Sequence, residues 1–336
     1  MITRVLALFL CAASIPALLP NAHAADADAP RNLNQLARWR ELWPTEVTIQ
    51  RGAQFQNGSS IRKGQVVVLD QVTPQGLRLD DGKMFFMYTD GDTDVMQRVN
   101  ALFNSLTPEQ RALKINDVRR NKALWPTRAT TRWAMTLDGG TQIAAGKELA
   151  VLGFLPDGRV QLADMEQNVS VPMDPWESDL FARARARVGQ TGDVSFSYRL
   201  LESMLDPSDD GSTVADYDYI VMYDGRDTCS RSVAFAPELA KFQEASSASG
   251  AKWLLVLGNA ASEPAVNRAH YRNMGLGGRA AKDGWGPMLY QYFQLGGYPT
   301  PWFYVYDRDG NQIATAGAAA ASYSEVLDFL SAKVTE

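Results

Sequence analysis

The first half of the chain contains a repeated sequence. The tetrapeptide Leu-Trp-Pro-Thr occurs at residues 42–45 and again at residues 124–127, 82 positions later. The same offset relates two pairs of glycines, a pair of isoleucines and a Pro-x-Gly turn: Gly58 and Gly140, Gly64 and Gly146, Ile61 and Ile143, 74–76 and 156–158. Towards the end of the units Asp94 aligns with Asp179, an offset of 85. Such a repeat restricts the first half of the chain to two copies of one small fold.

Each copy is predicted to contain four or five short strands between two helices. The opening helices are expected at 33–41 and 115–123, and apolar strands at 66–69 and 149–152. A Pro-x-Gly turn closes each of these strands, because proline presets φ and glycine supplies a positive φ. Short strands joined by polar turns favour small closed barrels. The copies resemble bacterial SH3-like domains in tandem, and we assign them to residues 33–106 and 107–188.

Several aromatic residues in the two repeats have two possible roles. Trp43, Trp125, Trp133 and Tyr88 could bind a peptide or a cell-wall component, or they could belong to the cores of units that act as spacers. The repeated Trp-Pro-Thr is predicted at a helix-to-strand junction, where packing is the usual reason for a tryptophan. We therefore favour the packing role.

The N-terminus has the pattern of a signal peptide. Arg4 precedes an apolar stretch at 5–19, and Ala22-His23-Ala24 is a small-x-small cleavage sequence. The apolar stretch is too short for a membrane span. We expect cleavage after Ala24, a secreted or periplasmic protein, and no membrane span after processing.

Removal of residues 1–24 leaves little scope for metal or disulfide chemistry. The chain has two cysteines and two histidines, and Cys11 and His23 lie in the signal peptide. Cys229 and His270 remain, so the processed chain can form neither an internal disulfide nor a Cys- or His-rich metal site. We expect no metal and no cofactor. A formal charge of −5 without a long basic run argues against nucleic acid as a partner.

The C-terminal half has an α/β pattern. The predicted order is strand, helix, strand, helix, hairpin and helix, and the strands are expected at 217–223, 253–258, 301–307 and 313–316. Cys229 lies between the first strand and the first helix, and the last helix is expected at 322–334. Residues 189–214 are predicted to link the two halves, with a short helix at 196–205.

The order of these elements, with a cysteine at the first strand–helix junction, resembles the thioredoxin fold over residues 215–336. Cys229 followed by Phe235-Ala236-Pro237-Glu238-Leu239 is similar to the Cys-x-x-Cys-x-x-Phe-Thr-Pro-x-Leu pattern of tryparedoxin- and nucleoredoxin-type proteins. The fold class is therefore multidomain: two small SH3-like barrels before an α/β thioredoxin-like domain. The resemblance implies that Pro299 is the cis-proline beside the reactive sulfur. It also implies that Thr228, Tyr298 and Thr300 contact the substrate.

The chain departs from the family pattern at two positions. Ser232 replaces the second, resolving cysteine, and Thr228 replaces the tryptophan that usually precedes the first cysteine. A thiolate at a helix N-terminus attacks disulfides, but Ser232 cannot resolve the resulting mixed disulfide. Isomerisation, in which the substrate's own thiol resolves the adduct, and resolution by a low-molecular-weight thiol such as glutathione both stay open.

Three functions fit these residues. The protein could be a monothiol Cys-x-x-Ser oxidoreductase or isomerase whose Cys229 acts on the thiols and disulfides of exported proteins. It could be a redox-inactive thioredoxin-like scaffold that binds partners through its fold and its SH3-like units. Less favoured is a lone reactive thiol that tethers a partner or senses oxidants.

Overall fold

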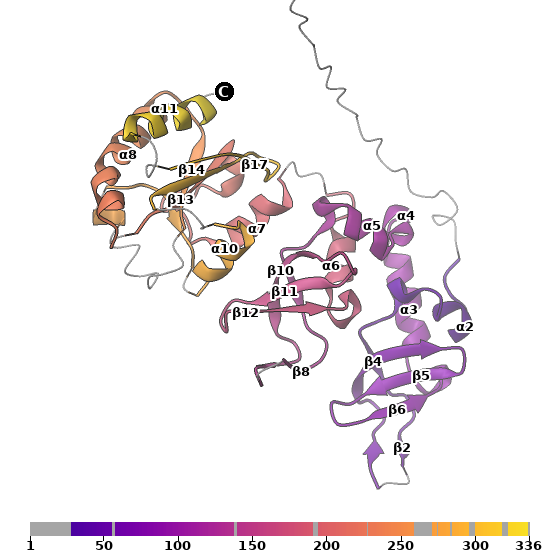
Figure 1. Ribbon diagram of the computed structural model, residues 1–336. Helices are drawn as coiled ribbons and strands as arrows, with labels where there is room; N and C mark the ends of the chain where they lie inside the picture. The colour runs from indigo at the N-terminus through magenta and orange to yellow at the C-terminus, as the bar shows by residue number, and fades with distance from the viewer. Residues whose placement is uncertain are drawn as a thin grey trace, which may run out of the picture.

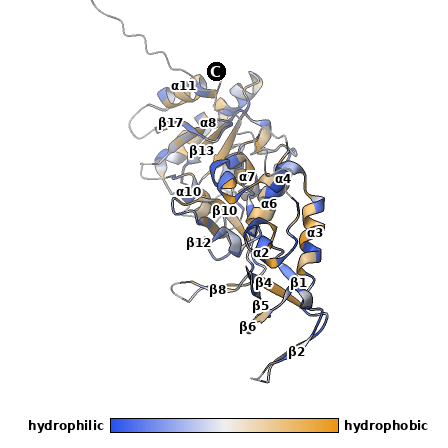
Figure 2. Ribbon diagram, turned by 90° about the vertical axis from the view of Figure 1, so that its right-hand side faces the viewer, coloured by the Kyte–Doolittle hydropathy of each residue, from blue (hydrophilic) through white to orange (hydrophobic). Residues whose placement is uncertain are grey.

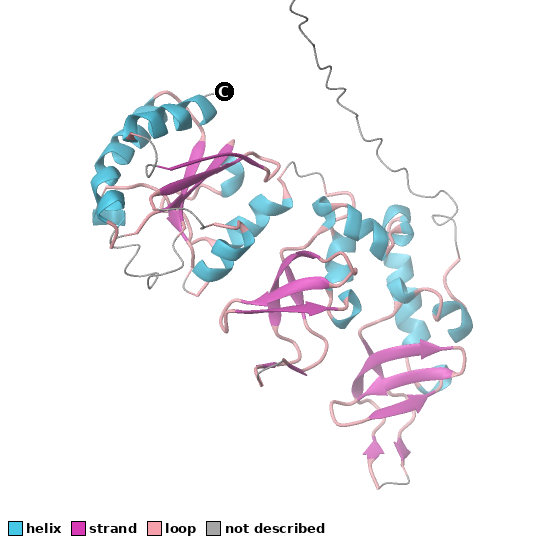
Figure 3. Ribbon diagram, in the orientation of Figure 1, coloured by secondary structure: helices cyan, strands magenta, loops and turns pink. Residues whose placement is uncertain are grey.

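The computed structural model describes residues 28–55, 58–137, 140–190, 194–226, 228–258, 271–273, 275–282, 284–295, 300–317 and 322–334. Within these ranges the chain forms two small units, each with its own antiparallel sheet, and a C-terminal α/β domain (Figures 1 and 3). The predicted signal peptide lies outside them. No helix within the described ranges is long and apolar enough to span a bilayer.

The first unit contains a four-stranded sheet in the order β1-β4-β5-β6 and a separate β2–β3 hairpin. Alternate residues of its strands face a core that α3 closes with Val95, Val99 and Phe103. Figure 2 shows strongly hydrophobic and strongly hydrophilic residues along α3, as expected for a helix with one buried side. The elements are α2 (Leu33–Leu36), η1 (Arg40–Leu42), β1 (Glu46–Thr48), β2 (Ala53–Gln54), β3 (Ser60–Ile61), β4 (Val66–Thr73), β5 (Gly76–Asp80), β6 (Phe85–Tyr88), η2 (Asp90–Asp92) and α3 (Val95–Ser105).

The second unit repeats this arrangement with a sheet in the order β12-β11-β10-β7 and a β8–β9 hairpin. Gly64 and Gly146, which match in the sequence repeat, both have a positive φ, at 85° and 75°. Such a backbone conformation favours glycine. The elements are α4 (Pro108–Ala112), α5 (Ile115–Arg120), η3 (Lys122–Leu124), β7 (Arg128–Thr130), β8 (Met135–Thr136), β9 (Gln142–Ile143), β10 (Glu148–Phe154), β11 (Val160–Asp164), β12 (Val169–Met173), η4 (Pro175–Glu177) and α6 (Leu180–Ala186).

The repeated tryptophan anchors the opening helix of each unit. The indole N–H of Trp43 donates a hydrogen bond to the carbonyl oxygen of Leu36 (2.8 Å), and that of Trp125 donates to Val118 (2.7 Å). Trp125 and Tyr88 are buried in the two cores. These contacts are what a packing role requires of Trp43 and Trp125.

An aspartate and an arginine also occupy equivalent places in the two units. Asp94 accepts a hydrogen bond from the backbone N–H of Thr48 (2.7 Å) and another from Arg98 (2.8 Å), which ties α3 to β1. The backbone N–H bond and the arginine hold the pKa of Asp94 below its usual value, although burial acts in the opposite direction. The equivalent residues of the second unit are Asp179, Thr130 and Arg183.

The described strands do not form the closed barrels that the sequence predicted. In the first unit β1 pairs with β4 and β6 pairs with β5, so β1 and β6 remain the two edges of an open sheet. The hairpin strands are two residues long and pair with each other. An isolated bridge between Ile49 and Thr93 connects the end of β1 to the start of α3. The second unit has the same open arrangement.

The C-terminal domain has a five-stranded sheet in the order β15-β14-β13-β16-β17. β13, β14 and β15 are parallel, whereas β16 and β17 run antiparallel to their neighbours. Helices α8 and α11 pack against one face and α7 and α10 against the other (Figure 1). The elements are α7 (Phe196–Met204), η5 (Val214–Asp216), β13 (Tyr219–Asp224), α8 (Ser230–Ala248), β14 (Trp253–Leu257), β15 (Arg279–Ala280), α10 (Gly286–Tyr292), β16 (Trp302–Tyr306), β17 (Gln312–Gly317) and α11 (Tyr323–Val334).

The segment predicted as a linker, 189–214, contributes to the core. Its predicted helix exists as α7, and Leu200, Leu201 and Met204 are almost fully buried. A single apolar cluster runs from the sheet of the second unit through α7 to one face of the C-terminal sheet. The second unit and the C-terminal domain therefore share a hydrophobic core.

This shared core predicts a large effect of a substitution in α7. Leu200→Ala should lower the free energy of unfolding by about 2–5 kcal/mol, because it removes a fully buried side chain between two packed layers. Val233→Ala, on the exposed side of α8, is the control and should change stability by less than about 0.5 kcal/mol. Denaturant unfolding followed by circular dichroism measures both. Equal, small effects of the two substitutions would mean that α7 is a peripheral linker.

Candidate active site at Cys229

Cys229 lies between β13 and α8. The strand ends at Asp224, and Cys229 is the N-cap residue of the helix, with an extended backbone (φ −95°, ψ 113°). Its carbonyl oxygen accepts the first helical hydrogen bond, from the N–H of Val233 (3.0 Å). The side chain is half-buried and the thiol is free. A residue at this position faces backbone N–H groups that have no partner within the helix.

The thiol contacts a segment far along the chain. Its Sγ donates a hydrogen bond to the carbonyl oxygen of Thr300, at a sulfur–oxygen distance of 3.5 Å. The contact follows from strand register, since Asp224 at the end of β13 pairs with Trp302 at the start of β16. Residues just beyond these positions therefore meet at the same edge of the sheet.

The surroundings of Cys229 favour its thiolate. Partial burial raises the pKa of the thiol, but hydrogen bonds lower it more, to about 7. The hydrogen bonds come from the side chains of Thr300 and Ser232 and from the backbone N–H groups of Ser232 and Arg231. A free cysteine has a pKa of about 8.5, so a large share of Cys229 is ionised at neutral pH.

Ser232 occupies the position at which a resolving cysteine would stand. It is 1% exposed, and its hydroxyl accepts a hydrogen bond from the backbone N–H of Arg226 (3.2 Å). Ser232 therefore closes the loop before α8 and stabilises the Cys229 thiolate. It carries no thiol and cannot attack a mixed disulfide.

The structure brings together only some of the residues predicted for the site. Thr300 contacts the thiol, and Thr228 is exposed next to it in the chain. Tyr298 and Pro299 lie outside the described residues. A cis peptide bond joins Thr300 to Pro301, two positions after the proline for which the resemblance implied it.

Two further residues at this edge of the sheet were not predicted. Asp224 is 1% exposed, and burial raises the pKa of its carboxyl. Its Oδ2 accepts a hydrogen bond from the hydroxyl of Tyr290 in α10 (3.1 Å), whereas its Oδ1 has no hydrogen-bond partner among the described residues. Tyr223 beside it is fully buried, and burial raises the pKa of its hydroxyl. An acidic residue that directly ends a buried strand was the available signal for Asp224.

Trp43 and Trp133, two of the aromatic residues singled out in the repeats, meet at the junction of the two units. They line a small cavity of about 110 Å³ together with Trp176, Arg40 and Arg132. The guanidinium of Arg40 stacks on both Trp43 and Trp176. No group of three or more His, Cys, Asp or Glu side chains that could hold a metal ion is found in the part of the chain that the structure describes.

A parallel β13–α8–β14 unit, an antiparallel β16–β17 hairpin and a closing α11 surround a cysteine at the start of α8. The C-terminal domain has a thioredoxin-like fold. A scan against protein-family models finds no match, and neither does a search of curated proteins.

The chain is similar to several solved structures at low sequence identity. A thioredoxin from Wuchereria bancrofti is 20% identical, and the match covers 35% of this chain and 83% of that one with a TM-score of 0.27. A thioredoxin-like protein from Aeropyrum pernix is 14% identical over 40% and 94% of the chains, with a TM-score of 0.29. A thiol:disulfide interchange protein from Bacteroides sp. is 13% identical over 40% and 86%, also with a TM-score of 0.29.

The contacts of Cys229 predict how its reactivity depends on pH. Alkylation by iodoacetamide should accelerate as pH rises, with a midpoint near pH 7, because the thiolate is the nucleophile. Thr300→Val removes a hydroxyl that stabilises the thiolate and should move the midpoint up towards about 8.5. Thr300→Ser keeps the hydroxyl and should leave the midpoint unchanged.

Cys229→Ser gives the background labelling for this experiment. A wild-type thiol that is labelled only after unfolding, or with a midpoint at or above that of a free cysteine, would contradict the described environment of Cys229.

Proposed function

We propose that this protein is a monothiol thiol–disulfide exchange protein of the thioredoxin-like type, with Cys229 as its nucleophile. The observation that carries the proposal is the position of a half-buried thiol at a helix N-terminus, where hydrogen bonds from Thr300, Ser232 and Arg231 lower its pKa to about 7. A thiolate with a pKa near the ambient pH combines a high ionised fraction with good nucleophilicity.

The exchange needs two steps and an outside thiol. The Cys229 thiolate attacks a disulfide R–S–S–R′, forms Cys229–S–S–R and releases R′–S⁻. A second thiolate, R″–S⁻, then attacks the R sulfur, forms R–S–S–R″ and regenerates Cys229. When R″ belongs to the same substrate, the result is isomerisation. When it is a low-molecular-weight thiol such as glutathione, the substrate is released as a mixed disulfide that further thiol reduces.

The substrates would be disulfides or mixed disulfides of exported proteins. The signal-peptide pattern of residues 1–24 supports export, and exported proteins are where disulfides persist. The motif from Cys229 to Leu239 supports a tryparedoxin- or nucleoredoxin-type relationship. The two repeat units, whose sheets are open, would serve as accessory contact surfaces for a peptide or wall component.

A second candidate is a thioredoxin-like scaffold that binds partners without turnover. The observation that favours it is the burial of Ser232, whose hydroxyl has become part of the loop structure instead of a second reactive group. The two candidates differ in whether Cys229 exchanges disulfides at all.

Ser232→Cys tests the exchange chemistry by adding the second, resolving thiol at the position where this chain has a serine. In a helix the Cα atoms of residues three positions apart lie about 5 Å from each other, within the Cα–Cα range of about 4.4–6.8 Å that a disulfide spans. The variant should therefore form an internal disulfide between Cys229 and the introduced cysteine, and reduce insulin disulfides with a turnover that wild type lacks. Ser230→Cys, one position after Cys229, is the matched control and should not gain this activity.

The readouts are the mass of the oxidised variant and the rate of insulin precipitation with a dithiol reductant. If Ser232→Cys folds and forms the disulfide but reduces no faster than Cys229→Ser, the scaffold function is the correct one.

A further inference from the structure

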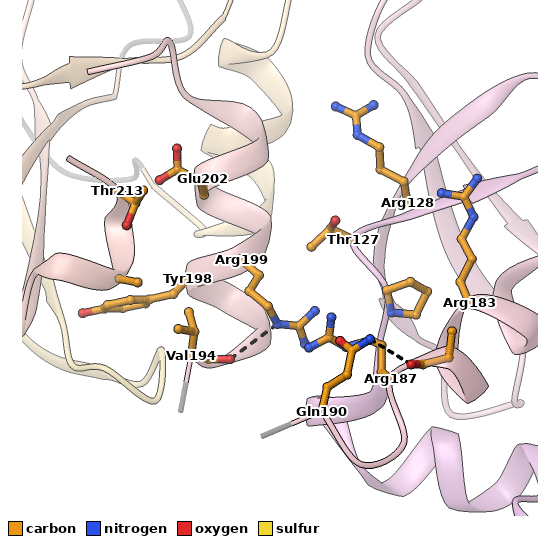
Figure 4. Close-up of a pocket in the computed structure, with 13 residues that line it drawn as sticks. Thr127, Arg128, Arg183, Arg187, Gln190, Val194, Tyr198, Arg199, Glu202 and Thr213 are labelled. Atoms are coloured by element: carbon orange, nitrogen blue, oxygen red, sulfur yellow. Dashed lines mark hydrogen bonds between the residues drawn. The ribbon is translucent and has the colours of Figure 1, made fainter. Parts of the chain in front are cut away.

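A groove runs between the second unit and helix α7, and Cys229 is not among the residues that line it. Its volume is about 660 Å³, within the range of sites for small molecules. One wall comes from the segment 126–128 and from α6 with the residues that follow it, and the other comes from α7 and η5 (Figure 4).

The groove is rich in positive charge. Four of its lining residues are arginines and one is an acid, Glu202. Both carboxylate oxygens of Glu202 accept hydrogen bonds from Arg279, each at 2.8 Å, so this acid is already neutralised. The four arginines are Arg128, Arg183, Arg187 and Arg199.

The arginines differ in their partners. Arg183 pairs with Asp179 (2.8 Å) and with Glu148 (3.1 Å), and Arg128 lies 3.5 Å from Glu148. These two guanidinium groups are therefore balanced by acids on the second unit.

Arg187 and Arg199 have no carboxylate within ion-pair distance among the described residues. Their hydrogen bonds go to backbone carbonyl oxygens and leave part of each guanidinium open to a ligand. Arg187 donates to Ala123 (3.0 Å). Arg199 donates to Trp125 (2.9 Å), Ala123 (3.1 Å), Lys122 (3.4 Å) and Val194 (3.4 Å). Figure 4 shows Arg199 extending from α7 towards the second unit, beside Arg187 and Gln190.

The two arginines influence each other electrostatically. Burial, and then the positive charge of Arg187, lowers the pKa of Arg199 to about 10. Burial also lowers the pKa of Arg187. The fold thus holds two partly desolvated like charges close together, which an anion between them would stabilise.

We propose that this groove binds a small organic polyanion whose carboxylate or phosphate groups are held by Arg187 and Arg199. The planar guanidinium fork matches such oxyanions with two parallel hydrogen bonds. Thr127 and Gln190 offer further polar groups, and Pro126 and Val194 offer apolar contacts for a carbon skeleton. One wall of the groove belongs to the second unit and the other to α7. A bound ligand would therefore bridge the two and stabilise the shared core.

The test uses the full chain with Cys229→Ser, so that the outcome does not depend on the thiol chemistry. The probes are tricarballylate, pyrophosphate and acetate, at constant ionic strength, followed by titration calorimetry and thermal unfolding. At least one of the two polyanions should bind with a one-to-one stoichiometry and raise Tm, and acetate should not. Binding of tricarballylate alone indicates a carboxylate ligand, and binding of pyrophosphate alone indicates a phosphate ligand.

Substitutions locate the site. Arg187→Gln should weaken binding of the effective probe by about tenfold or more, because a charge-assisted contact is lost. Arg199→Lys keeps the charge and tests the need for the guanidinium fork, and it should also weaken binding. Arg62→Gln removes an exposed charge in the first unit and is the control. The proposal is overturned if neither polyanion binds, or if Arg187→Gln and Arg199→Lys bind as well as Arg62→Gln.

Discussion

Strand β13 is the element on which the C-terminal domain and its thiol depend. It is the central strand, and both of its faces are buried: Ile220 and Met222 pack towards α7 and α10, while Val221 and Tyr223 pack towards α8 and α11. Its pairing with β16 fixes which residues stand beside its C-terminal end. Without this pairing the Thr300 carbonyl oxygen would not meet Cys229. A thiol on a short loop thereby acquires a defined environment.

Helix α7 extends this arrangement beyond the thioredoxin-like domain. Its apolar side joins the core of the second unit to the sheet, and Arg199 on its other side lines the groove that we assign to an anion. One short helix thus contributes to stability on one side and to a ligand site on the other. Cys229 and the cationic groove lie on different elements, so substitutions can test the two proposed sites separately.

Local patterns in the sequence predicted much of this structure. An apolar strand, a cysteine and a helical apolar spacing were enough to place Cys229 at the start of α8, and the recurring offset in the first half anticipated two similar units. Contacts that arise only when distant segments of the chain pair could not be predicted from the sequence. Whether a sheet closes into a barrel depends on which strand edges pair, and the sequence does not show this. Strand β15 is only two residues long, too short to give a sequence pattern. The Asp224–Tyr290 contact joins positions 66 apart, and the arginine groove exists only because α7 packs on the second unit.

The most direct test of Cys229 as a nucleophile is the intact mass of the folded protein after incubation with oxidised glutathione. We expect a single glutathione adduct on Cys229 that persists, because Ser232 cannot displace it, and that disappears only when an external thiol is added. Cys229→Ser should form no adduct. A folded wild-type protein that forms no adduct, while the unfolded chain forms one readily, would contradict the claim that Cys229 is a working nucleophile.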